Sequence, residues 1–412
     1  MRIAFVLTQS LESPSGLGRY WPLAKALAGR GHTVHIIALH HHFESLPEKS
    51  WLSNGVHVYY VAQMHVKKVG SDKTYFNPLQ LIWLALLATL KLTSALFEIR
   101  PEIVHLGKPH PMNGVAGIIY KLKTGAALYI DCDDYEAASN VFGGAWQRKI
   151  VAWLEDTLPR QAAGVTVNTH FMRERLIGLG CDPARVVYVP NGVDRARFGP
   201  LGAEPVEMLQ RQYSLAQKRV ILYAGSLALA SHRVDLLLRA FAQVVEQVDD
   251  AILMLVGGGE DRQRLLDLSA ELGIAGSVIH VGRVSPEQVP LYYGLAYLSV
   301  DPVSDDGAAR GRSPLKLYES LALGVPVVTA DVGDRRLALG DGHHGFLVEP
   351  GSVDSLASIL VDALRQPQQV ETRRSNILAD RDRMNLYWDQ LVDDFERVYG
   401  PDLLMEVEAI NK

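Results

Sequence analysis

The chain is poor in cysteine and has no excess of basic residues. Its 412 residues include only two cysteines, Cys132 and Cys181, and these have no metal-ligand spacing. A disulfide framework or a structural zinc site is therefore not expected, and the composition fits a reducing compartment. The net charge of −5 and the lack of a long basic run give no support to nucleic-acid binding. The opening MRIAFVLTQS has too short an apolar run for a signal peptide, so we expect a cytoplasmic location.

Long hydrophobic runs are also scarce. The most apolar segment, LQLIWLALLATLKLTSALF at 79–97, is interrupted by Lys91, and its unbroken part falls short of the roughly 20 residues that span a bilayer. Its pattern favours a buried helix. The alternative is a helix whose apolar face rests on a membrane surface, with Lys67, Lys68 and Lys73 beside it. At most, we expect peripheral contact with the inner face of a membrane through residues 79–97.

What the sequence does contain is an alternation of strand-like and helix-like segments. A hydrophobic content of 48% is ordinary for a soluble globular protein, and the length suits two domains. Runs such as RIAFVLT, HTVHIIAL and ALYIDC alternate with helical patterns as far as about residue 195, and RVILYAG, AILMLVGGG and SVIHVG then begin a second series. The alternation predicts an α/β fold with two doubly wound, Rossmann-like domains at 1–195 and 196–383. An amphipathic helix at about 384–400 would be free to return to the first domain.

A glycine-bearing loop follows the first predicted strand. Gly16, Leu17 and Gly18 suggest a dinucleotide motif, but Trp21 stands where its third glycine should be. Nicotinamide cofactors are therefore not expected. The loop either lets a phosphate or sugar approach the backbone or is simply a tight turn into a helix.

Histidines gather at the ends of two predicted strands. The three at 40–42 would point to alternate faces of an extended strand, so we expect a solvated loop there rather than a metal site. His105 and His110 surround another strand end, where a ligand could lie, but they have no third metal ligand nearby. His110 is a weak candidate for the side of the site that holds an acceptor.

Motifs spread over nearly the whole chain resemble the retaining glycosyltransferases of family 4, also called glycosyl transferases group 1. In order, they are LAKALAGRGHTVHII, VPNGVDRARF, ILYAGSL, LMLVGGGEDRQRLLDL, VIHVGRVSPEQVPLYYGLAYLSV, SPLKLYESLALGVPVVTADVG and HGFLVEPGSVDSLASIL. The resemblance implies the GT-B fold, in which two Rossmann-like domains face each other across a cleft. It further implies that the first domain holds the acceptor and the second the nucleotide-sugar donor.

The stretch RSPLKLYESLALG carries the donor residues that the resemblance implies. A helix opening at Ser313, Pro314 and Leu315 would offer free N–H groups to a diphosphate. Lys316 would reach the same diphosphate, and the Glu319 carboxylate would accept hydrogen bonds from both ribose hydroxyls. The plainer alternative is a surface ion pair between Lys316 and Glu319, which share one face of the helix.

The chain departs from the family pattern at several positions. Gly311 replaces a second glutamate, for which Asp305 and Asp306 are candidate substitutes, and Ser226 follows Gly225 where an arginine is usual. The resemblance implies further contacts with the donor. His232 and Arg233 lie near the place of a phosphate-binding lysine, and Arg283 with Val284 would lie beside the nucleobase. Of these two candidates for binding the diphosphate, Arg233 is the better one, because its guanidinium is always charged and can donate two hydrogen bonds to a phosphate.

Asp133 and Asp134, in YIDCDDYE, stand where the family often has a histidine and an aspartate near the donor sugar. Their carboxylates could bind sugar hydroxyls or help to deprotonate an acceptor, unless they only form a strand-end turn. The resemblance implies transfer of a sugar from a nucleotide donor to a glycan, lipid-linked or small-molecule acceptor, with retention and with no metal or other cofactor. The alternatives are a sugar-nucleotide epimerase and a non-catalytic binding subunit.

Overall fold

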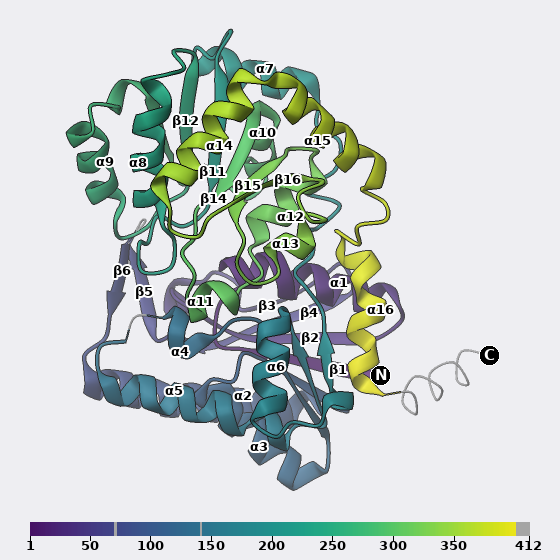
Figure 1. The fold of residues 1–412 in the computed structure, drawn as a ribbon. Helices are drawn as coiled ribbons and strands as arrows, with labels where there is room; N and C mark the ends of the chain where they lie inside the picture. Colours follow the sequence, from purple (N-terminus) through teal and green to yellow (C-terminus); the bar gives the residue numbers. More distant parts are fainter. Residues whose placement is uncertain (70–71, 141, 401–412) are drawn as a thin grey trace. The chain divides into compact units, whose positions relative to one another are not determined.

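The computed structural model describes residues 1–69, 72–140 and 142–400, without the side chains of 68–75, so the predicted roles of Lys68 and Lys73 lie outside it. The chain divides into two compact units (Figure 1). Unit 1 holds residues 1–192, 311–313 and the described residues from Trp388 on, and unit 2 holds 193–310 and 314–387. This division differs from the sequence-based one in three ways. The boundary falls three residues earlier, Gly311–Ser313 joins unit 1, and unit 2 extends to Tyr387 rather than to 383.

Unit 1 is built on an eight-stranded sheet in the order β10-β9-β8-β7-β1-β2-β4-β3. All neighbours are parallel except β3 and β4, which run antiparallel. Its strands are β1 (Arg2–Leu7), β2 (Thr33–His40), β3 (Ser50–Ser53), β4 (Val56–Gln63), β7 (Ile103–Gly107), β8 (Ala127–Cys132), β9 (Gly164–Val167) and β10 (Val186–Tyr188), and β5 (Val66–Val69) with β6 (Asp72–Tyr75) forms a separate hairpin. The predicted parallel sheet is confirmed. The hairpin and the edge strand β3 were not predicted.

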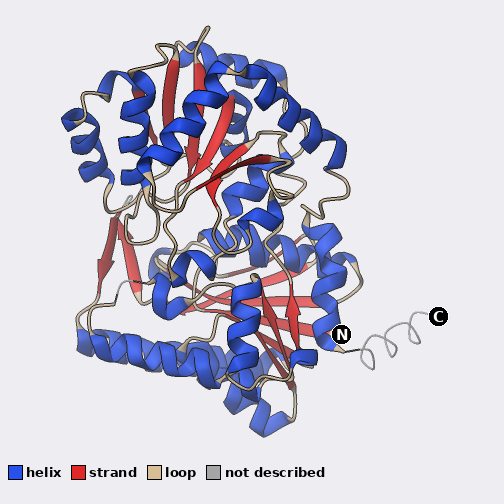
Figure 2. Ribbon diagram, in the orientation of Figure 1, coloured by secondary structure: helices blue, strands red, loops and turns tan. Residues whose placement is uncertain are grey.

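Helices cover both faces of this sheet (Figure 2). They are a π-helical turn (Gly16–Tyr20), α1 (Trp21–Gly29), α2 (Pro78–Ile99), α3 (Pro111–Thr124), α4 (Glu136–Ser139), α5 (Ala145–Thr157), α6 (His170–Gly178) and α16 (Trp388–Glu396), with 3-10 turns at Phe43–Ser45, Pro159–Gln161, Pro183–Arg185 and Arg397–Tyr399. On one face, Leu23 of α1 and Phe395 of α16 pack with Phe5. On the other, α2, α3, α5 and α6 share one apolar cluster with the strands. The segment from Trp388 therefore completes the core of unit 1.

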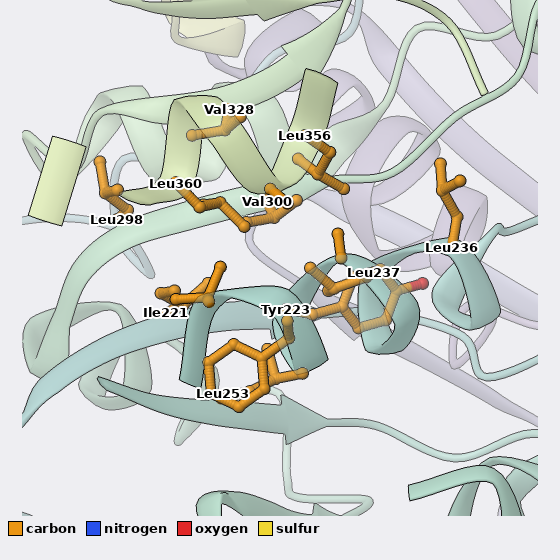
Figure 3. Packing of buried hydrophobic residues seen from close by; sticks show 14 of the residues in the cluster. Ile221, Tyr223, Leu236, Leu237, Leu253, Leu298, Val300, Val328, Leu356 and Leu360 are labelled. Atoms are coloured by element: carbon orange, nitrogen blue, oxygen red, sulfur yellow. The ribbon is translucent and has the colours of Figure 1, made fainter. Parts of the chain in front are cut away.

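Unit 2 is a six-stranded, fully parallel sheet in the order β13-β12-β11-β14-β15-β16. Its strands are β11 (Arg219–Ala224), β12 (Ala251–Val256), β13 (Val278–Gly282), β14 (Ala296–Asp301), β15 (Val327–Ala330) and β16 (Gly345–Val348). Its helices are α7 (Ala203–Gln212), α8 (Val234–Val245), α9 (Arg262–Glu271), α10 (Val289–Leu295), α11 (Gly307–Arg310), α12 (Leu315–Ala322), α13 (Arg335–Ala338), α14 (Val353–Arg365) and α15 (Pro367–Asp380), with a 3-10 turn at Ala275–Ser277. Leu237 of α8 and Leu360 of α14 pack on Ile221 and Val300 of the strands (Figure 3).

Each sheet has a point where the strand order reverses. In unit 1, β1 lies between β2 and β7, and in unit 2, β11 lies between β12 and β14. Ligands of open parallel sheets bind beside such points, at the carboxyl ends of the strands. The predicted site residues therefore have to be judged by whether they lie at these ends.

Candidate functional site

An acidic cluster lies at the carboxyl ends of β7 and β8 in unit 1. The Lys108 ammonium, directly after β7, lies 3.3 Å from Asp133 Oδ1, 2.9 Å from Asp134 Oδ2 and 2.5 Å from Glu136 Oε1. His110 Nε2 is 3.1 Å from the other Glu136 oxygen. Both predicted aspartates and His110 thus belong to one group of charges, which Lys108 holds together.

Burial and neighbouring charges shift the pKa values of two carboxyls in this cluster in opposite directions. Burial, together with the nearby Asp134 and Asp131 carboxylates, raises the pKa of Asp133 to about 7 despite the opposing effect of Lys108. Burial also disfavours the Glu136 carboxylate, but Lys108 and the His110 hydrogen bond outweigh it and hold the Glu136 pKa well below its usual range. At neutral pH, Asp133 is therefore poised to exchange a proton while Glu136 stays ionised.

The raised pKa of Asp133 predicts a pH-dependent effect of the Asp133→Asn substitution. Because the native state binds this proton more tightly than an unfolded chain with a pKa near 3.8, the wild type should lose stability as the pH rises from about 4 to 7. Asparagine cannot ionise and escapes this loss. The melting temperature of the variant minus that of the wild type should therefore be larger at pH 8 than at pH 5. A difference that stays constant across this range would contradict the raised pKa.

The glycine loop of unit 1 has a structural reason for its composition. A Cβ at Gly16 would lie 2.3 Å from the Ser10 carbonyl oxygen, so the loop can close on itself only with glycine. The Gly18 carbonyl accepts a hydrogen bond from the Trp388 indole N–H. Buried Arg19 next to it forms a two-pronged ion pair with Asp131 of β8. Leu17 is partly buried.

The prediction for residues 40–42 is wrong for two of the three histidines. His40 ends β2 and the following turn redirects the chain, so that His40 and His41 are both buried with their rings stacked 4.3 Å apart. The Nε2 atom of each lies 3.4 Å from a carboxylate oxygen of Glu12. Among the described residues, these three form one of three groups whose atoms are close enough to hold a cation, the others being His343, His344 and Asp380, and Asp133, Asp134 and Glu136.

In unit 2, the predicted Lys316 lies at the point where the strand order reverses. Its ammonium is 3.1 Å from Asp301, the last residue of β14, and Arg335 Nε binds the other oxygen of that carboxylate at 2.8 Å. The ammonium also lies 4.9 Å above the Tyr223 ring, and a Cβ on Gly225 would lie 3.1 Å from Lys316 Cε. The lysine therefore extends along the carboxyl ends of β11 and β14.

Glu319, one turn further along α12, is in a different environment. It is partly buried and accepts a hydrogen bond from the Tyr293 hydroxyl at 3.3 Å. Burial raises the pKa of this carboxyl, against the opposing effects of Arg197, Tyr293 and Lys316. The carboxylate is thus supported by one hydroxyl and two cations, which leaves it acceptor capacity for a ligand diol.

The loop after β11 depends on glycines at two places. A Cβ on Gly257 would lie 1.8 Å from the Gly225 carbonyl oxygen, and one on Gly259 would lie 2.6 Å from the backbone of Leu227. The backbones after β11 and β12 can therefore touch only because both positions lack side chains. The Tyr223 hydroxyl donates a hydrogen bond to the Ser226 carbonyl at 2.6 Å, which ties the loop to the end of β11.

The remaining predicted donor residues are more scattered. Arg233 directly precedes α8, binds Asp235 with two donors and donates to Ser304 after β14 at 2.6 Å, and His232 precedes it in the chain. Ser313 is buried in unit 1, where its side chain and carbonyl bind Asn191.

Pro314 and Leu315 open α12. Beyond β13, Arg283 is exposed, while Val284 packs on the unit 2 core. Asp305 pairs with Arg310 and Asp306 caps α11, so both side chains already serve a local turn.

Four residues of these clusters escaped sequence reasoning: Lys108 and Glu136 in unit 1, and Asp301 and Arg335 in unit 2. Lys108 follows a predicted strand and Asp301 ends one, so their positions at strand ends were a usable signal, whereas Glu136 and Arg335 are the first residues of the short helices α4 and α13. What the sequence could not give is the pairing, because Asp301 and Arg335 are 34 residues apart and Lys108 and Glu136 are 28 apart.

Two family models match the chain in succession. Residues 15–192 match the glycosyl transferase 4-like domain, and residues 207–379 match glycosyl transferases group 1. The chain belongs to the group 1 glycosyltransferases. The match covers both units, and the motif-based resemblance is confirmed.

Relatives of this glycosyltransferase chain act on different acceptors. It is 28% identical over 207 residues to a GDP-mannose-dependent alpha-(1-6)-phosphatidylinositol monomannoside mannosyltransferase of Mycolicibacterium smegmatis, covering 50% of this chain and 54% of that protein. It is also 28% identical over 277 residues to a D-inositol 3-phosphate glycosyltransferase of Gordonia bronchialis, covering 62% and 58%. The chain thus spans little more than half the length of the curated relatives it matches.

Solved structures agree on the fold over the whole chain. Sucrose-phosphate synthase of Thermosynechococcus elongatus superimposes with a TM-score of 0.77 at 18% identity, covering 99% of this chain and 100% of that one. Anabaena HepE in complex with UDP and glucose gives 0.73 at 19% identity, covering 97% and 99%. At these identities the likeness shows the GT-B fold and no more.

Proposed function

We propose that this chain transfers a sugar from a nucleotide-sugar donor to the hydroxyl of a glycan, lipid-linked or small-molecule acceptor. Lys316 is the observation that carries the proposal. Its ammonium lies at the carboxyl ends of β11 and β14, beside a glycine loop and at the amino end of α12, where free N–H groups favour a phosphate. Glu319 on the same helix would hold the ribose. The donor would therefore bind to unit 2.

In the proposed reaction, the bond from the anomeric carbon to the phosphate oxygen breaks and a bond to the acceptor oxygen forms. The nucleoside diphosphate leaves, and the proton of the acceptor hydroxyl passes to a base. Asp133 of unit 1 is the candidate base, because its pKa of about 7 lets it exchange a proton at neutral pH. Retention of the anomeric configuration is proposed on family membership, and a cytoplasmic location on the presence of two buried free thiols.

We further propose that transfer needs no metal ion. Asp133, Asp134 and Glu136 have a donor set suited to a divalent cation, but the Lys108 ammonium already lies within 3.3 Å of all three. A metal would have to displace a buried cation from this group. In unit 2, Lys316 and the α12 amino end supply positive charge for the diphosphate.

One experiment tests the proposal and separates it from its rivals. The full-length protein is screened by thermal shift with uridine, guanosine, adenosine and thymidine diphosphate sugars, because a ligand of the native state raises its melting temperature. The stabilising donor is then incubated with and without acceptors in EDTA. We expect donor consumption to depend on an acceptor and to survive EDTA. Isomerisation of the donor without acceptor would instead indicate an epimerase, and binding with no turnover would indicate a non-catalytic subunit. Loss in EDTA with recovery on adding manganese would refute the metal-free reaction.

The epimerase alternative has one structural observation in its favour. A Listeria monocytogenes protein described as a candidate UDP-N-acetylglucosamine 2-epimerase superimposes with a TM-score of 0.59 at 13% identity, covering 97% of this chain. The scaffold is therefore shared between the two chemistries. The matched families favour transfer, since both are families of glycosyl transferases.

A further inference from the structure

The exposed apolar side chains of this protein are concentrated on one side of unit 1. Of the sixteen large apolar side chains exposed among the described residues, twelve lie on three helices: six on α2, three on α3 and three on α5. Trp83 on α2 is 65% exposed and Trp153 on α5 is 63% exposed. The interpretation of residues 79–97 as a buried helix is therefore wrong, because only 22% of the most apolar part of α2 is buried.

The three helices form one surface, which we call the apolar face. They cover the same side of the unit 1 sheet and share its core cluster, and Figure 1 shows them together along the lower edge of the view. The Phe97 ring of α2 contacts the Tyr120 ring of α3, with centroids 5.2 Å apart. The Gly114 backbone of α3 packs against Leu158 at the end of α5. Their outward sides therefore point away from the same sheet.

The exposed residues on each helix follow helical spacing. On α5, Trp146, Ile150 and Trp153 stand at i, i+4 and i+7, so they lie on one stripe. Leu79, Trp83, Leu86 and Leu90 on α2 have the same spacing, and their stripe is opposite the buried Ala88, Leu92 and Leu96. Soluble proteins rarely expose contiguous apolar patches. Where such a patch is exposed, it usually marks a site that binds a partner or a membrane.

The charges around the apolar face are mostly positive, although the whole chain carries −5. The basic residues on the three helices are Lys91, Lys121, Lys123, Arg148 and Lys149, all exposed except the half-buried Lys121. The acidic ones are exposed Glu98, buried Glu155 and Asp156, which pairs with Arg175 of α6. Lysine and arginine beside an apolar stripe with tryptophans complement an anionic lipid surface.

We propose that the apolar face docks unit 1 on a bilayer that contains anionic phospholipids, with α2 and α5 lying in the plane of the interface. By length and composition, helix α2 is long and apolar enough to cross a bilayer. It lies on the surface instead, because Ala88, Leu92 and Leu96 belong to the core of unit 1 and crossing would remove them from it. The docking is separate from sugar transfer and holds whichever acceptor the protein uses.

Vesicle sedimentation of the full-length protein tests the docking. The wild type should sediment with vesicles of phosphatidylcholine and phosphatidylglycerol, more weakly with phosphatidylcholine alone, and more weakly in high salt, which screens the basic residues. The Trp83→Glu/Trp153→Glu variant should partition roughly a hundredfold less, since two large apolar side chains no longer leave water. Both positions are exposed, so the melting temperature should not change.

A matched control makes the same kind of change elsewhere. Leu337→Glu/Leu378→Glu alters two unit 2 side chains that are 60% and 52% exposed, and should bind vesicles like the wild type. Brominated lipids should quench the tryptophan emission of the wild type but only weakly that of the double tryptophan variant. Failure of the wild type to bind any vesicle would overturn the proposal. So would a lipid-free dimer that the tryptophan substitutions dissociate, because the face would then bind a second copy of the chain.

Discussion

Replacing Lys108 by methionine should lower the free energy of unfolding by about 3–5 kcal/mol, the usual cost of leaving buried charges without their partner. Its ammonium is the cation shared by Asp133, Asp134 and Glu136, and its side chain is 10% exposed. Methionine fills a similar volume, so little of the loss should come from a cavity. Urea unfolding monitored by circular dichroism measures the change.

The same variant makes a prediction about pH. Lys108 holds the pKa of Glu136 well below its usual range, so the stabilisation is present above the ordinary pKa of a glutamate and fades as the pH falls below it. The difference between the variant and the wild type should therefore shrink as the pH falls from about 5 to about 3. Lys123→Met, at an exposed position on α3, is the control and should change stability by less than about 0.5 kcal/mol. A similar, small loss in both variants would mean that the three carboxylates do not depend on Lys108.

Local sequence patterns were sufficient to predict the elements that position the donor site. A run of β-branched residues predicts a strand wherever both faces are buried, which holds for β11, β14 and β15. Gly324, with φ of 76°, follows the last turn of α12 in a backbone conformation that favours glycine. Lys316 and Glu319 follow from this helix, because residues three apart share one face of it.

The features that sequence reasoning missed depend on contacts distant in the chain. Periodicity shows that α2 has an apolar side, but it does not show how much of that side the rest of unit 1 covers. The sequence therefore predicts a buried helix where the structure has an exposed apolar stripe. The alternation rule separates His40 from His41 only while the strand continues, and the strand ends at His40. Lys316 likewise has two acidic neighbours. The sequence indicates Glu319, which is three residues away on the same helix, but not Asp301, which ends strand β14.

Lys316 and Glu319 should affect nucleotide binding in different ways. Lys316→Met should weaken binding of the nucleoside diphosphate by about 1.5–3 kcal/mol, the range for hydrogen bonds to charged groups, and leave binding of the nucleoside almost unchanged. Glu319→Ala should weaken both by a similar amount, because both ligands carry the ribose diol. Isothermal titration of the two variants with both ligands gives four affinities, and the nucleoside serves as the internal control.

The structure adds a second consequence for Lys316. Its ammonium shares the buried Asp301 carboxylate with Arg335, so Lys316→Met leaves Asp301 with only one of its two cations. We therefore expect the free protein to melt at a lower temperature, and the titrations must be made well below that temperature. Ser226→Arg, which places a guanidinium beside Gly225, where the family resemblance implies an arginine, should restore part of the diphosphate affinity of the methionine variant and none of the Glu319→Ala variant. Equal losses for nucleoside and nucleoside diphosphate in Lys316→Met would show that this lysine does not contact the phosphates, and the donor would then have to bind elsewhere.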